Sequence, residues 1–356
     1  MDIPTTLADV DAAFLSEVLG QPVEEVSRQR IAVGQGFLGE LARVSLKYGA
    51  GGAGPATVIT KIPTTDSGLK PLGLMLDLYL KEHRAYNEII PELKVTTPKA
   101  LYNGARPEDD LYCLILEDIG HLHSGDQLAG GTLEQARAAM KTAAGIHGRW
   151  WGRVDDLDWV PPIDSPLNLS LQSMYEDAFP MIVDQLGDLL GSDLMGHIER
   201  WIPTCSAWLE AYGAMSYTLT HYDFRLDNMF FDGKDLVLID WQTIGRGDGL
   251  GDVCPFLSSN LDSELRRIHE TDLLTLYHDA VNDLGGGYPD FVDLMMSYRA
   301  NLNFWLCHWC FTAVTAGGTS ERGEQLFERM VSRTADTVRD HESWELIGDH
   351  SWRPRL

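Results

Sequence analysis

Apolar residues follow strand-like spacing over much of the first third of the chain. Residues 31–48 place apolar positions on both sides of a glycine-rich turn, and residues 57–63 form another β-rich run. This pattern predicts two strands, a turn and a third strand. A helix is expected over about 72–93. Two further apolar runs, near 95–102 and 111–117, complete a small sheet.

An amphipathic helix is predicted ahead of these strands. Thr6 and Asp9 match a capping box at its start. Apolar residues then recur at helical spacing: Leu7, Val10, Phe14 and Val18. The helix and the sheet together predict one small α+β lobe.

Beyond about residue 130 the periodicity becomes mainly helical. Thr132 is a predicted cap, and one face of the following helix carries Leu133, Ala136, Met140, Ala143, His147 and Trp150. Further helices are expected over 170–190, 194–212, 263–284, 289–316 and 320–344. Among them, the runs NMFF and LVLID flank the turn DGKD and predict a hairpin. The chain is therefore expected to form a sheet-rich lobe, residues 1–118, and a larger helical lobe, residues 119–356.

Composition narrows the classes of partner. A chain of 356 residues, 44% hydrophobic and 23% charged, is long enough for two domains and is typical of a soluble globular protein. Its formal charge, 28 minus 53 or −25, argues against nucleic acid or an anionic membrane as a partner. The N-terminus does not match a signal peptide, no apolar run is long enough to span a membrane, and five cysteines fit free buried thiols. These features predict a cytoplasmic protein, and none of them indicates an oligomeric state.

One short stretch, LTHYDFRLDNMFFDGKDLVLIDWQ at 219–242, concentrates the candidate chemistry. His221, Asp223 and Asn228 form H-x-D-x-x-x-x-N, and Asp240 ends the second strand of the predicted hairpin. In phosphoryl transfer a carboxylate accepts a hydrogen bond from the attacking hydroxyl, while an amide oxygen and a second carboxylate hold Mg²⁺. Taken singly, these residues could merely stabilise a turn or cap a strand. Their joint spacing favours the catalytic interpretation.

A second set of candidates lies upstream. Gly34, Gly36 and Gly39 form G-x-G-x-x-G between two predicted strands, where backbone N–H groups could approach phosphates, although a plain hairpin turn would look the same. Lys61 lies in an otherwise apolar strand, and Glu82 lies in the helix that follows. A Lys–Glu pair would hold the ammonium against the α- and β-phosphates, whereas a lysine at a sheet edge could simply reach solvent.

In this order the parts resemble a protein-kinase-like fold, and specifically the aminoglycoside phosphotransferase, choline kinase and ecdysteroid-kinase-like superfamily. The resemblance covers roughly residues 30–260, and its most specific pieces are HYDFRLDN, LVLIDWQTIGRGDGLGD and LILEDIG. It implies ATP and Mg²⁺ as cofactors. It also implies that the backbones of Glu117 and Ile119 contact adenine and that Asp252 braces the catalytic loop. From its position alone, Asp252 could equally be a helix N-cap.

The sequence departs from this family and from protein kinases at two places. Tyr222 stands where the family usually has glycine, so the catalytic turn is expected to be bulkier. Asp240 is followed by Trp241 and Gln242 instead of Phe-Gly, and no A-P-E follows, so the activation segment of protein kinases is missing. A small hydroxyl compound is therefore the expected substrate.

The expected reaction is ATP-dependent phosphorylation of that hydroxyl, with Asp223 as the base. Arg225 could approach the transferred phosphoryl group or pair with Asp227. Trp305, His308 and Trp309 could line the acceptor pocket or belong to a packed helix core.

Several acceptors and one inactive alternative remain open. The acidic composition suits an aminoglycoside, whereas the aromatic segment 303–316 suits a lipophilic alcohol such as a sterol or terpenoid. GDQLAGG, with Asp126, resembles a lobe-junction segment of ecdysteroid-kinase-like members and favours the second. A macrolide phosphotransferase, a choline or ethanolamine kinase, and a nucleotide-binding pseudokinase are the alternatives.

Overall fold

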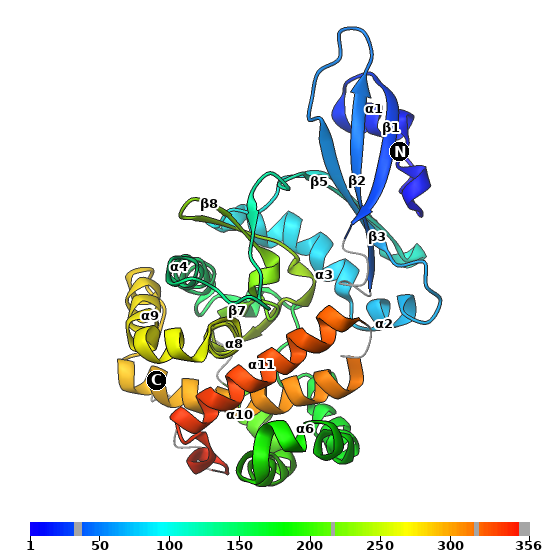
Figure 1. Cartoon of the computed structure of the whole chain (residues 1–356). Coiled ribbons are helices and arrows are strands. Elements are labelled where there is room, and N and C mark those ends of the chain that lie inside the picture. Colours follow the sequence, from blue (N-terminus) through cyan, green and yellow to red (C-terminus); the bar gives the residue numbers. More distant parts are fainter. Residues whose placement is uncertain (32–37, 215–217, 317–319, 349–356) are drawn as a thin grey trace. The chain divides into compact units, whose positions relative to one another are not determined.

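The computed structural model describes residues 1–31, 38–214, 218–316 and 320–348 (Figure 1). The chain divides into two compact units. Unit 1 consists of Met1–Glu92, Thr96–His123 and Val237–Thr243. Unit 2 consists of Leu93–Val95, Ser124–Leu236 and Ile244–Leu356. A short segment from the second half of the sequence, Val237–Thr243, thus folds with the N-terminal residues.

A five-stranded antiparallel sheet forms the centre of unit 1, in the order β1-β2-β3-β5-β4. The strands are β1 (Val23–Ile31), β2 (Gly39–Tyr48), β3 (Thr57–Pro63), β4 (Ala100–Arg106) and β5 (Leu111–Glu117). Helix α1 (Ala12–Leu19) packs against the strands, and Figure 1 shows it beside β1 and β2. Because side chains alternate along a strand, Val58 and Ile62 of β3 enter the α1-side core, and Lys61 projects from the opposite face.

Two local details of unit 1 differ from the predictions. The Thr6–Asp9 capping box closes a separate 3₁₀ turn, η1 (Leu7–Asp9), and α1 has its own N-cap at Asp11. The helix expected over 72–93 is divided into α2 (Lys70–Met75), α3 (Leu78–Arg84), a π-turn and a 3₁₀ turn. Asp77, the N-cap of α3, has a left-handed φ of 52° and so separates α3 from α2.

Two strands of unit 1 also begin away from their expected positions. Strand β1 starts at Val23, before the first expected strand. The pattern does not predict this start, because β1 is an edge strand whose mostly exposed sequence, VEEVSRQRI, lacks an apolar alternation. Strand β4 starts at Ala100 instead of near residue 95.

Unit 2 is mainly helical. Its helices are α4 (Leu133–Trp150), α5 (Pro166–Leu169), α6 (Leu171–Trp201), α7 (Cys205–Gly213), α8 (Leu250–Asn260), α9 (Ser263–Asp283), α10 (Phe291–Ala316) and α11 (Glu321–Asp340). Helix α4 begins at the predicted cap, where Thr132 and Gln135 form a capping box. Helix α6 breaks at Gly191, in the gap expected between the helices over 170–190 and 194–212, and a 3₁₀ turn (Ile202–Thr204) divides the second of these into the end of α6 and α7. All residues of α8 are buried, so it has no amphipathic period and was not predicted.

Short strands carry the candidate catalytic segment. They are β6 (His123–Ser124), β7 (Thr218–Thr220), β8 (Met229–Asp232), β9 (Asp235–Leu238) and β10 (Gly245–Gly247). The predicted hairpin is confirmed, because β8 and β9 flank a turn in which Gly233 has a φ of 60°. Strand β7 pairs with β10, and β6 lies beside β8 in a three-stranded sheet.

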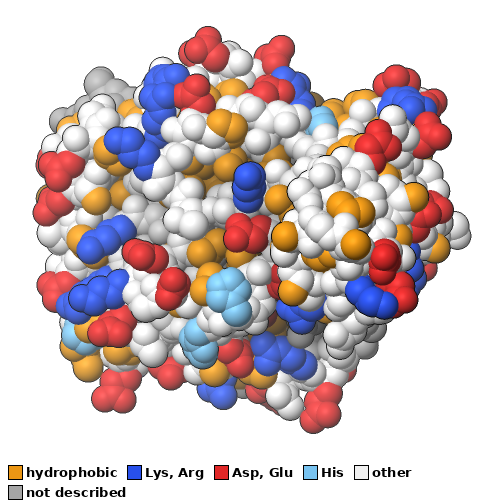
Figure 2. Space-filling model, turned by 90° about the horizontal axis from the view of Figure 1, so that it is seen from above, with side chains coloured by type: hydrophobic (Ala, Val, Ile, Leu, Met, Phe, Trp, Pro, Cys, Tyr) orange, Lys and Arg blue, Asp and Glu red, His pale blue; other side chains and the backbone are white. Residues whose placement is uncertain are grey.

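The acidic excess does not form one field on the face drawn in Figure 2. Among the described residues of that face, Asp and Glu side chains are interspersed with Lys and Arg side chains. Within the described ranges, no helix is long and apolar enough to cross a membrane.

Candidate active site

Lys61 is held between two carboxylates of unit 1. Its Nζ atom lies 2.7 Å from Glu82 Oε2 and 2.8 Å from Asp240 Oδ1. The Lys61 side chain is 11% exposed and that of Glu82 is 4% exposed. Glu82 comes from α3, which packs on the same face of the sheet, and Asp240 comes from the segment that follows β9.

Lys61 attracts both carboxylates of this group, whereas Glu82 and Asp240 repel each other. Burial opposes the charge on Lys61, but Asp240 and Glu82 outweigh that effect and raise its pKa above the ordinary value. Burial raises the pKa of Glu82 above its ordinary value, Lys61 opposes this shift, and the nearby Asp240 carboxylate adds to it. Lys61 is therefore protonated at neutral pH and presents a fixed positive charge.

The predicted glycine loop is described only in part. Gly34 and Gly36 lie outside the described residues. Gly39 is the first residue of β2 and pairs with Pro63 of β3. A Cβ atom added to Gly39 would lie 3.6 Å from Lys61 Cε, so this glycine borders the lysine side chain.

The implied adenine-binding residues lie at and just after the end of β5, also in unit 1. The Glu117 amide donates to the Lys99 carbonyl at 2.9 Å, and the Ile119 carbonyl accepts from the Leu122 amide at 2.9 Å. Between them, Asp118 accepts from Arg43 Nε at 2.6 Å. This ion pair ties the segment to β2.

The segment His221–Asn228 of unit 2, which carries the predicted catalytic residues and is here called the catalytic loop, lies between β7 and β8. Both carboxylate oxygens of Asp223 are engaged. Oδ1 accepts from Arg225 Nε at 2.8 Å, and Oδ2 accepts from Asn228 Nδ2 at 2.6 Å. The Asp223 side chain is nevertheless 26% exposed, so a hydroxyl can still reach it.

Asn228 is turned by the same contacts. Its Nδ2 donates to the backbone carbonyl of Asp223 at 2.9 Å as well as to the side chain. With the nitrogen committed in this way, Oδ1 is the atom that Asn228 can offer to a cation. Arg225 also donates from Nη1 to Asp227 Oδ2 at 3.3 Å, so it pairs with both acids.

Asp252 braces the loop from α8. Its carboxylate accepts from the backbone N–H groups of His221 at 2.8 Å and Tyr222 at 2.7 Å. The buried ring of His147 lies 3.1 Å away through Nε2. Asp252 is the third residue of α8 and not its N-cap, because Gly249 holds that place. The contact from His147 was missed, since the helical pattern assigned that residue only to an apolar face.

Tyr222 fits the loop because glycines surround its ring. Its φ is 59°, in the left-handed region that favours glycine and costs other residues about 1–2 kcal/mol. A Cβ atom added to Gly245 would lie 2.5 Å from Tyr222 Cε2, and one added to Gly251 would lie 2.8 Å from Cε1. A Cβ atom on Gly247 would collide with the hydroxyl oxygen. The bulkier turn expected from the sequence is thus accommodated by three residues of the IGRGDGLGD stretch.

Trp305, His308 and Trp309 form one aromatic cluster on α10. The Trp305 and Trp309 ring centroids are 4.9 Å apart, and His308 Nδ1 lies 2.9 Å from the Tyr175 hydroxyl of α6. Trp305 is 5% exposed, which favours the packing interpretation for that residue. Burial lowers the pKa of His308 to about 4, so its ring is neutral at physiological pH.

Comparison with known proteins gives a family and a fold. The model of the phosphotransferase enzyme family matches residues 70–284. No curated protein shows significant similarity to the sequence.

Three similar solved structures have TM-scores above one half. A spectinomycin phosphotransferase in complex with ADP and spectinomycin has a TM-score of 0.52 at 13% identity, covering 96% of this chain and 98% of that one. The GDP and kanamycin complex of APH(2")-IIia has a TM-score of 0.55 at 13% identity, covering 93% and 98%. Choline kinase from Cryptosporidium parvum has a TM-score of 0.55 at 12% identity, covering 91% and 93%. The likeness confirms the predicted kinase-like α+β fold.

Removing the Lys61 ammonium should destabilise unit 1. We expect Lys61→Ala to lower the free energy of unfolding by about 3 kcal/mol, because two carboxylates then face each other without a cation. Urea titration followed by circular dichroism measures this. Lys47→Ala is the matched control, since the Lys47–Glu25 pair is 62% and 69% exposed and its loss should leave the midpoint unchanged. Equal shifts for the two variants would contradict the role of burial.

The close approach of Gly247 to the Tyr222 hydroxyl can be tested with a pair of substitutions. Gly247→Ala should destabilise the protein by about 1–3 kcal/mol, because the new methyl group overlaps the Tyr222 hydroxyl. In a Tyr222→Phe background the overlapping atom is gone, and the same substitution should cost much less. A urea double-mutant cycle measures the difference. An identical penalty in both backgrounds would rule out this contact as the cause.

Proposed function

The chain belongs to the phosphotransferase enzyme family, and we propose that it transfers the γ-phosphoryl group of MgATP to a hydroxyl group of a small molecule. The observation that carries this proposal is the buried Lys61 ammonium between Glu82 and Asp240. A fixed cation held by carboxylates suits the binding of nucleotide phosphates, because the positive ammonium attracts the negative phosphate oxygens. The Lys61 ammonium can also donate hydrogen bonds to these oxygens, which ionised carboxylates cannot do.

The backbone after β5 supports adenine as the base. Hydrogen bonds already use the Glu117 amide and the Ile119 carbonyl. The other backbone group of each residue, the Glu117 carbonyl and the Ile119 amide, would read the base. A carbonyl suits the amino donor of adenine, whereas guanine carries a carbonyl acceptor at the same position.

Asn228 and Asp240 are the proposed metal ligands. An amide oxygen and a carboxylate are hard donors, which suit Mg²⁺. Within the described residues, no group of three or more His, Cys, Asp or Glu side chains could by itself hold a metal ion. When bound, Mg²⁺ supplies positive charge that neutralises the phosphates during transfer.

Asp223 is the proposed base. Arg225 and Asn228 orient its carboxylate, and each carboxylate oxygen retains a second lone pair that can accept a bond from the acceptor hydroxyl. Asp223 would then take the hydroxyl proton as the oxygen attacks the γ-phosphorus and the bond from that phosphorus to the departing ADP breaks. Arg225 acts here through Asp223, and most of the acceleration comes from placement and charge.

The acceptor is assigned only as a small hydroxyl compound. The similar structures concern spectinomycin, kanamycin and choline kinase, so their chemistry differs too much to select one class. The test is release of ADP from MgATP in the presence of pooled alcohols, amino sugars and choline. Turnover with any pool supports the proposal. Mg-dependent ATP binding without turnover would favour a pseudokinase.

Replacing the base should separate binding from chemistry. We expect Asp223→Asn to lower kcat by about 10²–10⁴-fold while the Kd for MgATP changes little, because the amide cannot accept the proton. ADP release and calorimetric titration of ATP measure the two quantities. Asp232→Asn is the control, since Asp232 is an exposed acid at the end of β8. Full activity in the Asp223 variant would remove it as the base.

The chain should prefer ATP to GTP. Guanine would place an acceptor against the Glu117 carbonyl, so we expect the Kd for MgGTP to exceed that for MgATP by about tenfold or more. Competition of each nucleotide against a fluorescent ATP analogue measures the ratio. Equal affinities would show that the segment after β5 does not read the base in this way.

A further inference from the structure

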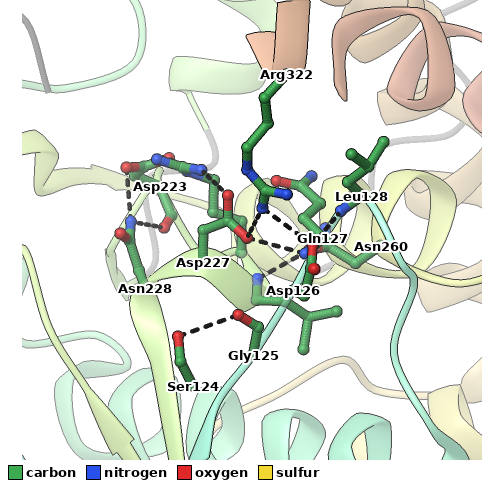
Figure 3. Close-up of polar contacts among 12 residues, drawn as sticks. Ser124, Gly125, Asp126, Gln127, Leu128, Asp223, Asp227, Asn228, Asn260 and Arg322 are labelled. Carbon is green, nitrogen blue, oxygen red and sulfur yellow. Dashed lines mark hydrogen bonds and ion pairs between the residues drawn. The ribbon is translucent and has the colours of Figure 1, made fainter. Parts of the chain in front are cut away.

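Asp227 links the proposed catalytic residues to the rest of unit 2. It lies in the catalytic loop, just before Asn228, and both of its oxygens have partners. Oδ2 accepts from Arg225 Nη1 at 3.3 Å, and Oδ1 accepts from the backbone N–H of Gln127 at 2.9 Å. Through Arg225, the position of Asp227 therefore affects the orientation of Asp223 (Figure 3).

Residues 124–129, here called the junction segment, lie directly against the catalytic loop. The Gly125 amide donates to the Met229 carbonyl at 2.8 Å. A Cβ atom on Gly125 would collide with the Leu226 carbonyl, so this approach requires glycine. Asp126 turns the segment by accepting from the amides of Leu128 at 3.0 Å and Ala129 at 3.2 Å. The junction segment thus packs directly against the catalytic loop and supports it.

Helix α11 holds both parts with arginines. Arg322 Nη2 lies 3.0 Å from Asp126 Oδ1 and 3.8 Å from Asp227 Oδ1. Figure 3 shows its guanidinium extending from α11 to lie between these two acids. Further along the helix, Arg333 is almost completely buried and donates to the Gln127 carbonyl at 2.8 Å. Two arginines of one helix thus contact the junction segment, and Arg322 also contacts the catalytic loop.

From this arrangement we propose that Arg322 is a positioning residue for phosphoryl transfer, acting through Asp227 and Arg225 on the base Asp223. The inference rests on the proposed function. Arg322 and Arg225 share the negative charge of Asp227. Without Arg322, Asp227 attracts Arg225 more strongly and draws its guanidinium away from Asp223, so the base loses its orientation. The end of α11 that carries Arg322 thereby contributes modestly to the rate of the reaction.

The first test compares two arginines of α11. We expect Arg322→Ala to lower kcat by about threefold to fivefold at an unchanged KM for MgATP, which is the scale of a partly exposed ion pair. Arg322→Lys should restore most of the loss, because an ammonium can also bridge the two acids. Arg339→Ala is the control, since Arg339 bonds to the Asp193 carboxylate and the Leu190 carbonyl, neither of which belongs to the loop or the junction segment. The assay is ADP release from MgATP in the presence of the pooled alcohols, amino sugars and choline used to test the proposed function.

A cycle with Asp227→Asn separates positioning from a general loss of structure. If Arg322 acts through Asp227, the double variant should be no slower than Asp227→Asn alone. Additive losses, an Arg322→Ala variant with wild-type kcat, or an equal loss in Arg339→Ala would overturn the inference.

Hydrogen exchange tests the same contact without turnover. Peptides covering 124–129 and 221–229 should exchange faster in Arg322→Ala than in wild type, whereas Arg339→Ala should leave them unchanged. If the wild type releases no ADP, the proposed function fails while this measurement still decides the contact. Unchanged exchange in Arg322→Ala would show that the arginine does not hold the loop.

Discussion

A buried ammonium group that must remain charged is the constraint on which unit 1 depends. Lys61 stays charged because it pairs with Glu82 and Asp240. These two acids come from different elements and lie close only because the chain folds. A buried charge without partners is far more costly than a paired one, so β3, α3 and the segment 237–243 are held in one arrangement. The charge that would meet nucleotide phosphates is fixed by the interaction that stabilises the unit.

The catalytic loop obeys a related constraint on backbone groups. Its amides at His221 and Tyr222 are satisfied by the buried carboxylate of Asp252. Tyr222 occupies a left-handed conformation that glycine would adopt without strain, and three nearby glycines leave space for its ring. The departure from the family pattern is thus compensated in the neighbouring stretch, which keeps the loop geometry compatible with an oriented Asp223.

Polar contacts then connect this loop to distant sequence. Asp223 is held by Arg225, Arg225 also contacts Asp227, and Asp227 meets the junction segment and Arg322. Each contact is modest alone, but together they orient a carboxylate that remains partly exposed. The orientation of the Asp223 carboxylate therefore depends on contacts from several parts of unit 2, including α11.

The sequence alone determined the local features, because spacing along the chain fixes them: the cap of α4, the β8–β9 hairpin, and the nearness of Asp223 and Asn228 within one short loop. It also indicated a charged pairing for Lys61, since a lysine in an apolar strand needs a partner. Tertiary structure decided the rest. Helix α8 is buried on all sides and edge strand β1 is mostly exposed, so neither shows a period. The contact of Arg322 with Asp227 joins charged residues from distant segments, and such pairs leave no periodic signal because only the folded chain sets their distance.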